Sequence, residues 1–316
     1  MRFRALAVLA LLTTTTNLLS AGTAPHEAVM DETVSLRPNL TPGYEARVVM
    51  EVKRMTNERL GMAPGGGKAP ERTLSGEQKV GFLMKVVRSD ESGAVVTLRI
   101  DDIDMKATTP RGEFSWNSAD PRKPSDNTNL ALTSSRSMLG ATITLTLDKD
   151  GNITGSDNGG VNMPTGDLAD YARLVVGNEE ARARWSPILA PKKADATAKV
   201  GESWKLVEVM KNPPIGRFDT NMDLKLASAD KRSARVEIAG NYTLVAFPEG
   251  ATLLFDVKES KVAGSVDWDR TTGLFKTAEL DLMIELHGTA QGLPIQRRTE
   301  TNIKFRREPV PAPKSE

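Results

Sequence analysis

Apolar and polar residues alternate with a period of two along most of this chain, and this pattern predicts antiparallel β-strands. The clearest example occurs twice, at residues 82–100 and 222–238. In each copy two alternating runs flank a break that begins at an aspartate, Asp90 in the first and Asp230 in the second. Such a period buries one face of a strand and leaves the other face in water.

Further alternating runs, bounded by Gly, Pro, Asp and Asn, predict the other strands. They cover residues 44–60, 141–147, 153–157, 200–209, 253–268, 274–288 and 295–307. The basic residues of the last run, among them Arg297, Lys304 and Arg306, suggest a solvated edge strand that is protected by its charge.

One segment has a helical period instead. Leu168, Tyr171 and Leu174 recur at a spacing near 3.6 and predict a helix. Thr165 is the expected N-cap, and Pro187 and Pro191 are expected to end the helix or a short second helix that follows it.

Several landmarks recur in the same order on the two sides of this helix. The two alternating stretches are 140 residues apart, Pro42-Gly43-Tyr44 matches the segment 200–204, and the turn at 148–151 matches the turn at 269–273. This order indicates an internal repeat. The alternative is that any antiparallel β protein repeats strand, turn and strand.

The predicted fold is mainly β. It has two related antiparallel β units, built as curved sheets in a sandwich or half-barrel, with one helical segment between them. The sequence leaves open whether the two units share one core. The expected division is a signal peptide at 1–21, a flexible lead-in at 22–40, a first β unit at 41–163, a helical segment at 164–190, a second β unit at 191–308 and a polar tail at 309–316.

The first 21 residues are typical of a cleaved secretory signal. Arg2 and Arg4 precede an apolar run at 5–12 that is too short to span a bilayer, and small residues follow at 20–22. An exported protein, periplasmic or extracellular, without an integral membrane span after cleavage is therefore expected. An uncleaved N-terminal anchor is the alternative.

Composition narrows the possible chemistry. The chain of 316 residues has no cysteine, which excludes disulfides, thiol catalysis and thiolate metal sites. Removal of Arg2 and Arg4 with the signal leaves 40 basic residues (42 − 2) against 41 acidic residues. A nearly neutral chain does not favour nucleic acid as a partner.

The whole mature chain resembles an uncharacterised family of exported bacterial β-rich proteins. The resemblance rests on Pro42-Gly43-Tyr44, on Val200-Gly201-Glu202-Ser203-Trp204 in mid-chain, and on the turn from Asp269 to Gly273. It implies an exported β-rich domain and no established activity. Bacterial lipoprotein carriers, with curved sheets around an apolar cavity, are similar in general pattern without a shared motif.

Phe114 and Trp116 are the candidate ligand-binding residues, because they lie in a polar stretch at about 107–136. The alternative is that both rings dock onto their own sheet. Tyr44 and Trp204 open equivalent strands and are expected to close the core at the end of each half.

No catalytic residues, metal site or cofactor is predicted. Asp102 and Asp104 share a strand face, but no further motif accompanies them. The segment 148–152 has the alternating oxygen ligands of a calcium loop but lacks the later glycine and glutamate, so a hairpin turn is expected there. His287 is expected at the surface, and a site built from it and His26 is not.

These observations favour a non-enzymatic binding or structural protein of the bacterial cell envelope. The first alternative is a carrier of a lipid or another apolar ligand in a cavity between sheets, and the second is a hydrolase that uses carboxylates. The expected partner is an envelope component or an apolar molecule.

Overall fold

The computed structural model describes residues 33–61, 71–110, 112–119, 136–161, 169–191, 196–212, 216–247, 253–290 and 293–310. The predicted signal peptide, the first part of the lead-in, the predicted N-cap Thr165 and most of the polar tail lie outside these residues.

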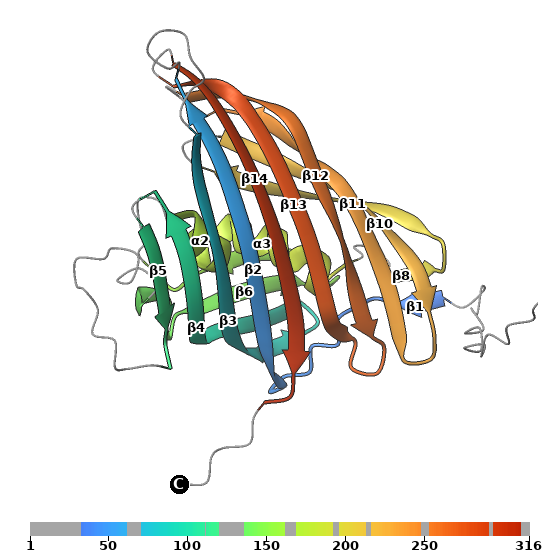
Figure 1. Cartoon of the computed structure of the whole chain (residues 1–316). Helices are drawn as coiled ribbons and strands as arrows, with labels where there is room; N and C mark the ends of the chain where they lie inside the picture. Colours follow the sequence, from blue (N-terminus) through green and yellow to red (C-terminus); the bar gives the residue numbers. More distant parts are fainter. Residues whose placement is uncertain are drawn as a thin grey trace, which may run out of the picture.

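One antiparallel sheet dominates the structure (Figure 1). Its strands follow the order β7-β6-β4-β3-β2-β14-β13-β12-β11-β10-β9, and β5 pairs with one end of β4. In the first half the strands are β2 (Glu45–Leu60), β3 (Glu71–Asp90), β4 (Gly93–Thr109), β5 (Gly112–Asn117), β6 (Thr142–Asp148) and β7 (Ile153–Asp157). In the second half they are β9 (Ser203–Asn212), β10 (Gly216–Ala229), β11 (Ser233–Ala246), β12 (Leu253–Asp269), β13 (Leu274–Ala290) and β14 (Leu293–Glu308).

The mainly β class is confirmed, and the two predicted units are continuous with each other. Strand β14 from the end of the chain pairs with β2 from its beginning, with Phe305 opposite Met50. One large apolar cluster extends from Val34 to Phe305 and includes buried residues of both units. The two units therefore share one core, the point that the sequence leaves open.

The hairpins of the two halves match in local detail. The β3–β4 hairpin has a bulge between Val86 and Arg88, and the β10–β11 hairpin has one between Leu226 and Ser228, at the same offset of 140. The Gly43 amide donates to the Val86 carbonyl at 2.9 Å, and the Gly201 amide donates to the Leu226 carbonyl at 2.7 Å. These matches support the internal repeat, which stays a prediction.

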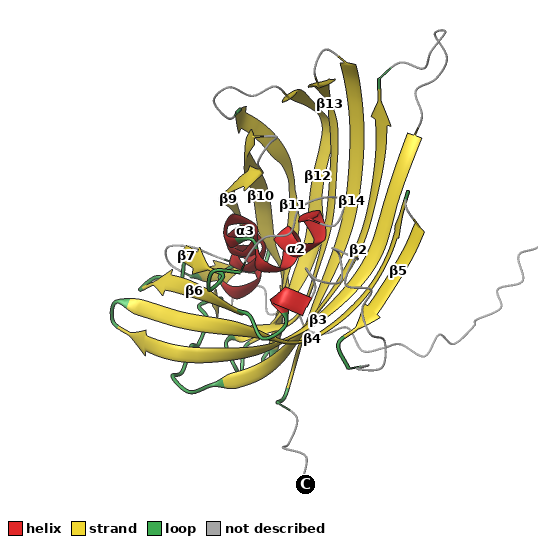
Figure 2. Ribbon diagram, turned by 90° about the vertical axis from the view of Figure 1, so that its left-hand side faces the viewer, coloured by secondary structure: helices red, strands yellow, loops and turns green. Residues whose placement is uncertain are grey.

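Two helices, α2 (Ala169–Val176) and α3 (Asn178–Leu189), lie inside the curve of the sheet (Figure 2). Helix α3 packs against β7 and β9, the two strands at the open ends of the sheet. A single helical turn also occurs at 136–138. Within the described part of the chain, every helix is too short or too polar to cross a membrane.

Trp185 of α3 occupies the centre of the core. Its side chain is fully buried, and its ring centroid lies 6.0 Å from that of Phe82, 6.2 Å from that of Phe275 and 5.0 Å from that of Phe305. These partners come from β3, β13 and β14, so one indole ring connects the helix to both halves of the sheet. Edge and tilted aromatic contacts of this kind add to the stabilisation from burial.

Polar contacts fix α3 against both open ends of the sheet. The Ser186 hydroxyl donates to the buried Glu208 carboxylate of β9 at 2.7 Å, and the Ser156 hydroxyl of β7 donates to the Asn178 carbonyl. Helix α3 ends at Leu189, between the two prolines that were expected to end it, and Pro187 itself lies inside its last turn.

The flexible lead-in is a wrong prediction for residues 33–40. Strand β1 (Thr33–Ser35) pairs with β8 (Thr197–Lys199), and the side chains of Val34 and Leu36 are fully buried. This segment is polar overall, but its few apolar residues are buried in the main apolar cluster.

The predicted edge strand at 295–307 is also wrong, because β14 lies in the middle of the sheet between β13 and β2. Its charged residues are tolerated because they are paired. On the outer face, for example, Lys304 forms an ion pair with Glu279 at 3.0 Å and Arg298 forms one with Glu300 at 2.9 Å.

Arg307 joins the ends of three strands. It donates to the Phe275 carbonyl at 2.7 Å, to the Tyr44 hydroxyl at 2.6 Å and to the Asp269 carboxylate at 3.0 Å. Trp204, which opens the second half, donates its indole N–H to the Pro191 carbonyl at 2.7 Å. The three segments quoted for the family resemblance, around Tyr44, Trp204 and Asp269, therefore have structural roles.

Replacement of Trp185 by alanine is expected to lower the free energy of unfolding by about 3–5 kcal/mol, the usual range for loss of a large aromatic side chain from a core. Urea unfolding followed by circular dichroism measures the change. The control is Asn178→Ala, an exposed position on the same helix. Equal stability of the two variants would contradict a central role for the indole ring.

The turn at Asp269 is expected to make stability depend on pH. Partial burial opposes ionisation of Asp269, but hydrogen bonds from Thr272, Thr271 and Arg307 outweigh it and lower the pKa. A lowered pKa in the folded state stabilises the protein above the unfolded value of about 3.9, and the contribution is lost as the pH falls through the folded value. Asp269→Asn should therefore lose less stability than the wild type between pH 7 and pH 3.

Thermal unfolding midpoints at both pH values test this expectation. The control is Asp223→Asn, which removes an exposed partner of Lys205. A pH dependence that is unchanged by Asp269→Asn would contradict the role of this carboxylate.

Candidate ligand-binding site

The inner face of the sheet, which faces α2 and α3, carries two apolar clusters. The main cluster packs around Trp185. The second cluster has four buried residues, Phe218, Phe255, Leu286 and Ile295, and half-buried neighbours such as Ile284. It lies on the other half of the strands, toward the end where β13 finishes and β14 begins, which is at the top in Figure 1.

Between the two clusters, polar side chains face inward on three neighbouring strands. We call this row the polar belt; it comprises Gln78 of β3, Arg54 and Thr56 of β2, and Arg297, Thr299 and Thr301 of β14. The alternation that buries Met50 and Val52 also turns Arg54 and Thr56 toward the inside. Thr56 and Thr299 lie opposite each other and share a hydrogen bond of 3.2 Å.

A cavity lies between the polar belt, the second cluster and the two helices. Its volume is about 130 Å³. Its lining combines three arginines, Arg54 of β2, Arg173 of α2 and Arg297 of β14, with apolar residues such as Phe218, Ile284 and Leu286. Sites that enclose a whole drug-sized ligand span about 300–1,000 Å³, so this cavity suits the polar end of a ligand better than all of it.

Charged side chains of both signs line this cavity. Three arginines line it, whereas Glu180 of α3 is its one acidic residue among the lining residues that the structure describes. Burial raises the pKa of Glu180, although Arg184 and Arg173 act in the opposite direction.

Tyr242 adds a neutral donor to the same cavity. It keeps some exposed surface, but the protein atoms packed around it desolvate the phenol and raise its pKa. The hydroxyl group therefore stays protonated at neutral pH. In the described ranges this hydroxyl has no hydrogen-bond partner from the protein, so it is available to a bound molecule.

Gln78 is a second unsatisfied group on the inner face of the sheet. Its side chain is 2 % exposed, and neither its amide nitrogen nor its amide oxygen has a partner within the described part of the protein. A buried amide without partners costs stability and is uncommon in folded proteins. The polar belt thus contains an amide that a water molecule or a ligand would stabilise.

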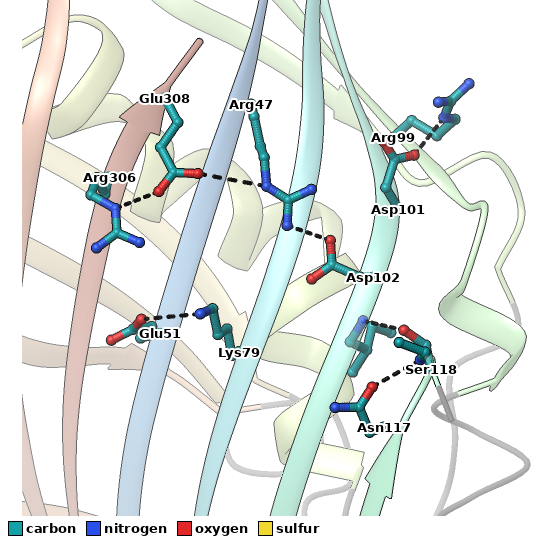
Figure 3. A network of polar contacts seen from close by, with 12 residues as sticks. Arg47, Glu51, Lys79, Arg99, Asp101, Asp102, Asn117, Ser118, Arg306 and Glu308 are labelled. Atoms are coloured by element: carbon teal, nitrogen blue, oxygen red, sulfur yellow. Dashed lines mark hydrogen bonds and ion pairs between the residues drawn. The ribbon is translucent and has the colours of Figure 1, made fainter. Parts of the chain in front are cut away.

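The carboxylates considered for hydrolysis lie on the outer face, and each has its own partner. Figure 3 shows Asp102 in a row with Arg47 and Glu308, across β4, β2 and β14. The Arg47 guanidinium donates to Asp102 at 2.6 Å, and Asp104 accepts a hydrogen bond from the Asn117 amide at 3.3 Å. The two groups are not arranged around a shared cleft as a pair of acid and base would be.

The pair between Arg47 and Asp102 depends on a glycine. Gly81 of β3 lies between the two residues, and a Cβ atom at this position would overlap both the carboxylate and the guanidinium. The absent side chain gives Arg47 the space to reach across β3.

An open groove of about 920 Å³ runs over the outer face. Five basic and five acidic residues line it, and many of them pair with each other, such as Lys53 with Glu77 at 2.9 Å. Exposed pairs of this kind contribute little energy and are screened by salt. We therefore regard the inner cavity as the better candidate, although it is smaller.

The structure places Phe114 and Trp116 on β5, which pairs with β4. Trp116 is 7 % exposed and belongs to the main cluster, whereas Phe114 is half-buried against that cluster and also borders the outer groove. Both rings thus dock onto their own sheet, and a contact with a ligand stays a prediction.

Other residues considered from the sequence have structural partners. Asp148 accepts hydrogen bonds from the amides of Asp150 and Asn152, both at 2.9 Å, as expected of a hairpin turn between β6 and β7. His287 lies 2.6 Å from Glu285, and both are half-buried. The described ranges contain no group of three or more His, Cys, Asp or Glu residues placed to hold a metal ion.

The sequence analysis did not select the residues of the inner cavity. A signal was present, because Arg54 continues the inward phase of Ala46, Val48 and Val52, and a charged residue in that phase is unusual. Arg173 gave no such signal, since its place depends on how α2 packs against the sheet.

Replacement of Gly81 by alanine is expected to lower the free energy of unfolding by about 1–3 kcal/mol, because the new Cβ atom forces the side chains of Arg47 and Asp102 apart. The control is Gly155→Ala, where the nearest atom would lie at an ordinary 3.9 Å. In the double variant Gly81→Ala with Asp102→Ala, the measured loss of unfolding free energy should be smaller than the sum of the losses in the two single variants. Simple additivity in urea unfolding would contradict this explanation.

No protein-family model matches this chain, and no curated protein matches it either. Among solved structures, DynF from the dynemicin biosynthesis pathway of Micromonospora chersina is 10% identical, with 94% of each chain covered and a TM-score of 0.20. An outer membrane channel from Pseudomonas putida F1 is 10% identical (85% of this chain, 97% of the other; TM-score 0.25). OpdQ from Pseudomonas aeruginosa is 7% identical (83% and 98%; TM-score 0.22). These likenesses carry no functional argument, and the proposal below rests on the geometry of the site.

Proposed function

We propose that this chain is an exported, non-enzymatic binding protein of the bacterial cell envelope, which holds a lipid or another largely apolar ligand on the inner face of its sheet. The observation that carries the proposal is the cavity between α2 and the second apolar cluster. Concave sites with apolar walls and a few polar groups are typical of small-molecule binding. The signal-like N-terminus supports export.

A scaffold role is the competing interpretation. A pure scaffold would benefit from an inner face packed as densely as other protein cores. The inner face instead combines a cavity with the unsatisfied amide of Gln78 and the free hydroxyl of Tyr242, within the part of the chain that the structure describes. These features favour binding over a purely structural role.

Binding of N-phenyl-1-naphthylamine, a neutral probe that fluoresces in apolar sites, tests the proposal. The wild type should bind the probe at micromolar concentration. Ile284→Asn places an amide on the apolar wall of the cavity and should weaken binding by about tenfold, since burial of an unpaired amide costs about 1–3 kcal/mol.

The matched control is Val207→Asn, which makes the same type of change at a position that is 48% exposed on the outer face of β9. This variant should bind the probe like the wild type. Native mass spectrometry of protein purified gently from the envelope adds a second readout, an adduct that is lost on denaturation. Absence of both probe binding and an adduct would overturn the proposal.

A further inference from the structure

Strands β11 and β12 are paired along only part of their length. Their ladder ends at the pair Gly240 and Val262, although β11 continues to Ala246 and β12 begins at Leu253. Beyond that pair, within the part of the chain that the structure describes, β11 pairs with β10 alone and β12 with β13 alone. The two strands follow each other in the chain, and such a hairpin is normally paired next to its connection. Here the pairing is missing at that end.

We call this unpaired stretch the split; it comprises residues 243–246 of β11 and 254–259 of β12. Ser260 marks where it begins. The Ser260 hydroxyl accepts a hydrogen bond from the Tyr242 amide at 3.0 Å and donates one to the Tyr242 carbonyl at 3.1 Å, so a side chain takes the place of a backbone pair. Strand β12 also shifts register against β13 between Val257 and Glu259. A bulge of this kind bends a strand and increases its twist, which accounts for the departure of β12 from β11 at this level.

Apolar residues line both sides of the split. On the inner side, Leu244 of β11 and Val257 of β12 pack against the second cluster. The alternation of the strands turns Val245 and Leu254 to the outer face, where they are 44% and 53% exposed. Tyr242, at the beginning of the split, also lines the inner cavity. The split therefore adjoins exposed apolar side chains on one side, and the second cluster and the cavity on the other.

The split can widen without breaking a backbone ladder. Along a paired ladder, separation of two strands breaks the hydrogen bonds between them, and each bond left unmade costs free energy. Among the described residues, no backbone–backbone hydrogen bond joins 243–246 to 254–259. Widening the split stretches only the side-chain contact of Ser260. Segments with so few contacts are the first to open in native proteins.

We infer that the split between β11 and β12 is a lateral entrance to the inner cavity, through which an apolar chain passes between the two strands. This inference rests on the proposed function and specifies how the ligand reaches its site. An apolar chain keeps contact with apolar side chains from Val245 and Leu254 inward to Leu244 and Val257. A polar molecule would lose water on this path, and these side chains offer it no hydrogen-bond partner.

Cross-linking across the split tests the inference on the full mature chain. The chain has no cysteine, so two introduced cysteines have only each other as partners within one molecule. Val245→Cys with Asp256→Cys places them at exposed positions on the two sides of the split. Their disulfide should lower both the association and the dissociation rate of N-phenyl-1-naphthylamine about tenfold or more, because a closed entrance limits both rates. Stopped-flow fluorescence measures the rates, and reduction of the disulfide should restore them.

A second pair and a control pair accompany this variant. If the first disulfide does not form, Thr243→Cys with Glu259→Cys replaces it, because these residues lie beside Ser260, which already holds the strands in contact. The control is Ala239→Cys with Ala263→Cys, which lie opposite each other in the paired part of the same strands. Mass spectrometry verifies each link. The control link should leave both rates unchanged.

Ser260→Ala acts in the opposite direction and needs no cross-link. It removes the contact that holds the split together, so both rates should rise by about three- to tenfold, the factor that corresponds to loss of a hydrogen bond. The matched control is Ser265→Ala. This hydroxyl accepts a hydrogen bond from Arg235 in the paired part of the two strands, and its loss should not change the rates.

The outcomes separate the inference from the proposed function. Wild-type rates in a verified cross-link across the split, or in Ser260→Ala, would overturn the inference and leave the proposed function intact, because the ligand would then enter elsewhere. Equal changes in the control variants would also overturn it, because the effect would then be one of general stiffness. Failure of the wild type to bind the probe would overturn both.

Discussion

The structure depends on how an open sheet buries its inner face. A closed barrel pairs all its strands, but here β7 and β9 do not pair with each other, and α3 lies between them. Trp185 makes this arrangement stable, because its ring contacts aromatic side chains from both halves of the sheet. The position of α3 then determines where α2 lies, and α2 supplies part of the wall of the inner cavity.

Along the same strands, the inner face is a densely packed core in one part and a partly polar surface in another. Near Trp185 it is packed as a protein core, whereas toward Ile295 it has polar and half-buried groups. The polar belt marks the change, and it contains groups such as the Gln78 amide that a stability-optimised core would replace by apolar side chains. Retention of such groups at one place is what a site for a polar ligand atom would require.

Much of the architecture was predictable, because a period of two is a strong local signal. The strands around Val48, Leu224 and Leu280 all follow it. The central place of β14 was not predictable, since it depends on pairing with β2 across almost the whole chain. The residues of the inner cavity were harder still to predict from the sequence. Arg54 is visible as a charge in an inward phase, but its proximity to Arg173 depends on helix packing that no local pattern encodes.

The pairing of β14 with β2 also has a consequence for how the chain folds. The hairpins of each half join neighbouring segments and need only short loops to close, whereas contact between Ile295 and Leu60 requires most of the chain to be in place. We therefore expect the joining of the halves to be a late and slow step. Until it occurs, β2 exposes unpaired N–H and C=O groups along its length, which makes the half-formed chain a target for chaperones or for aggregation.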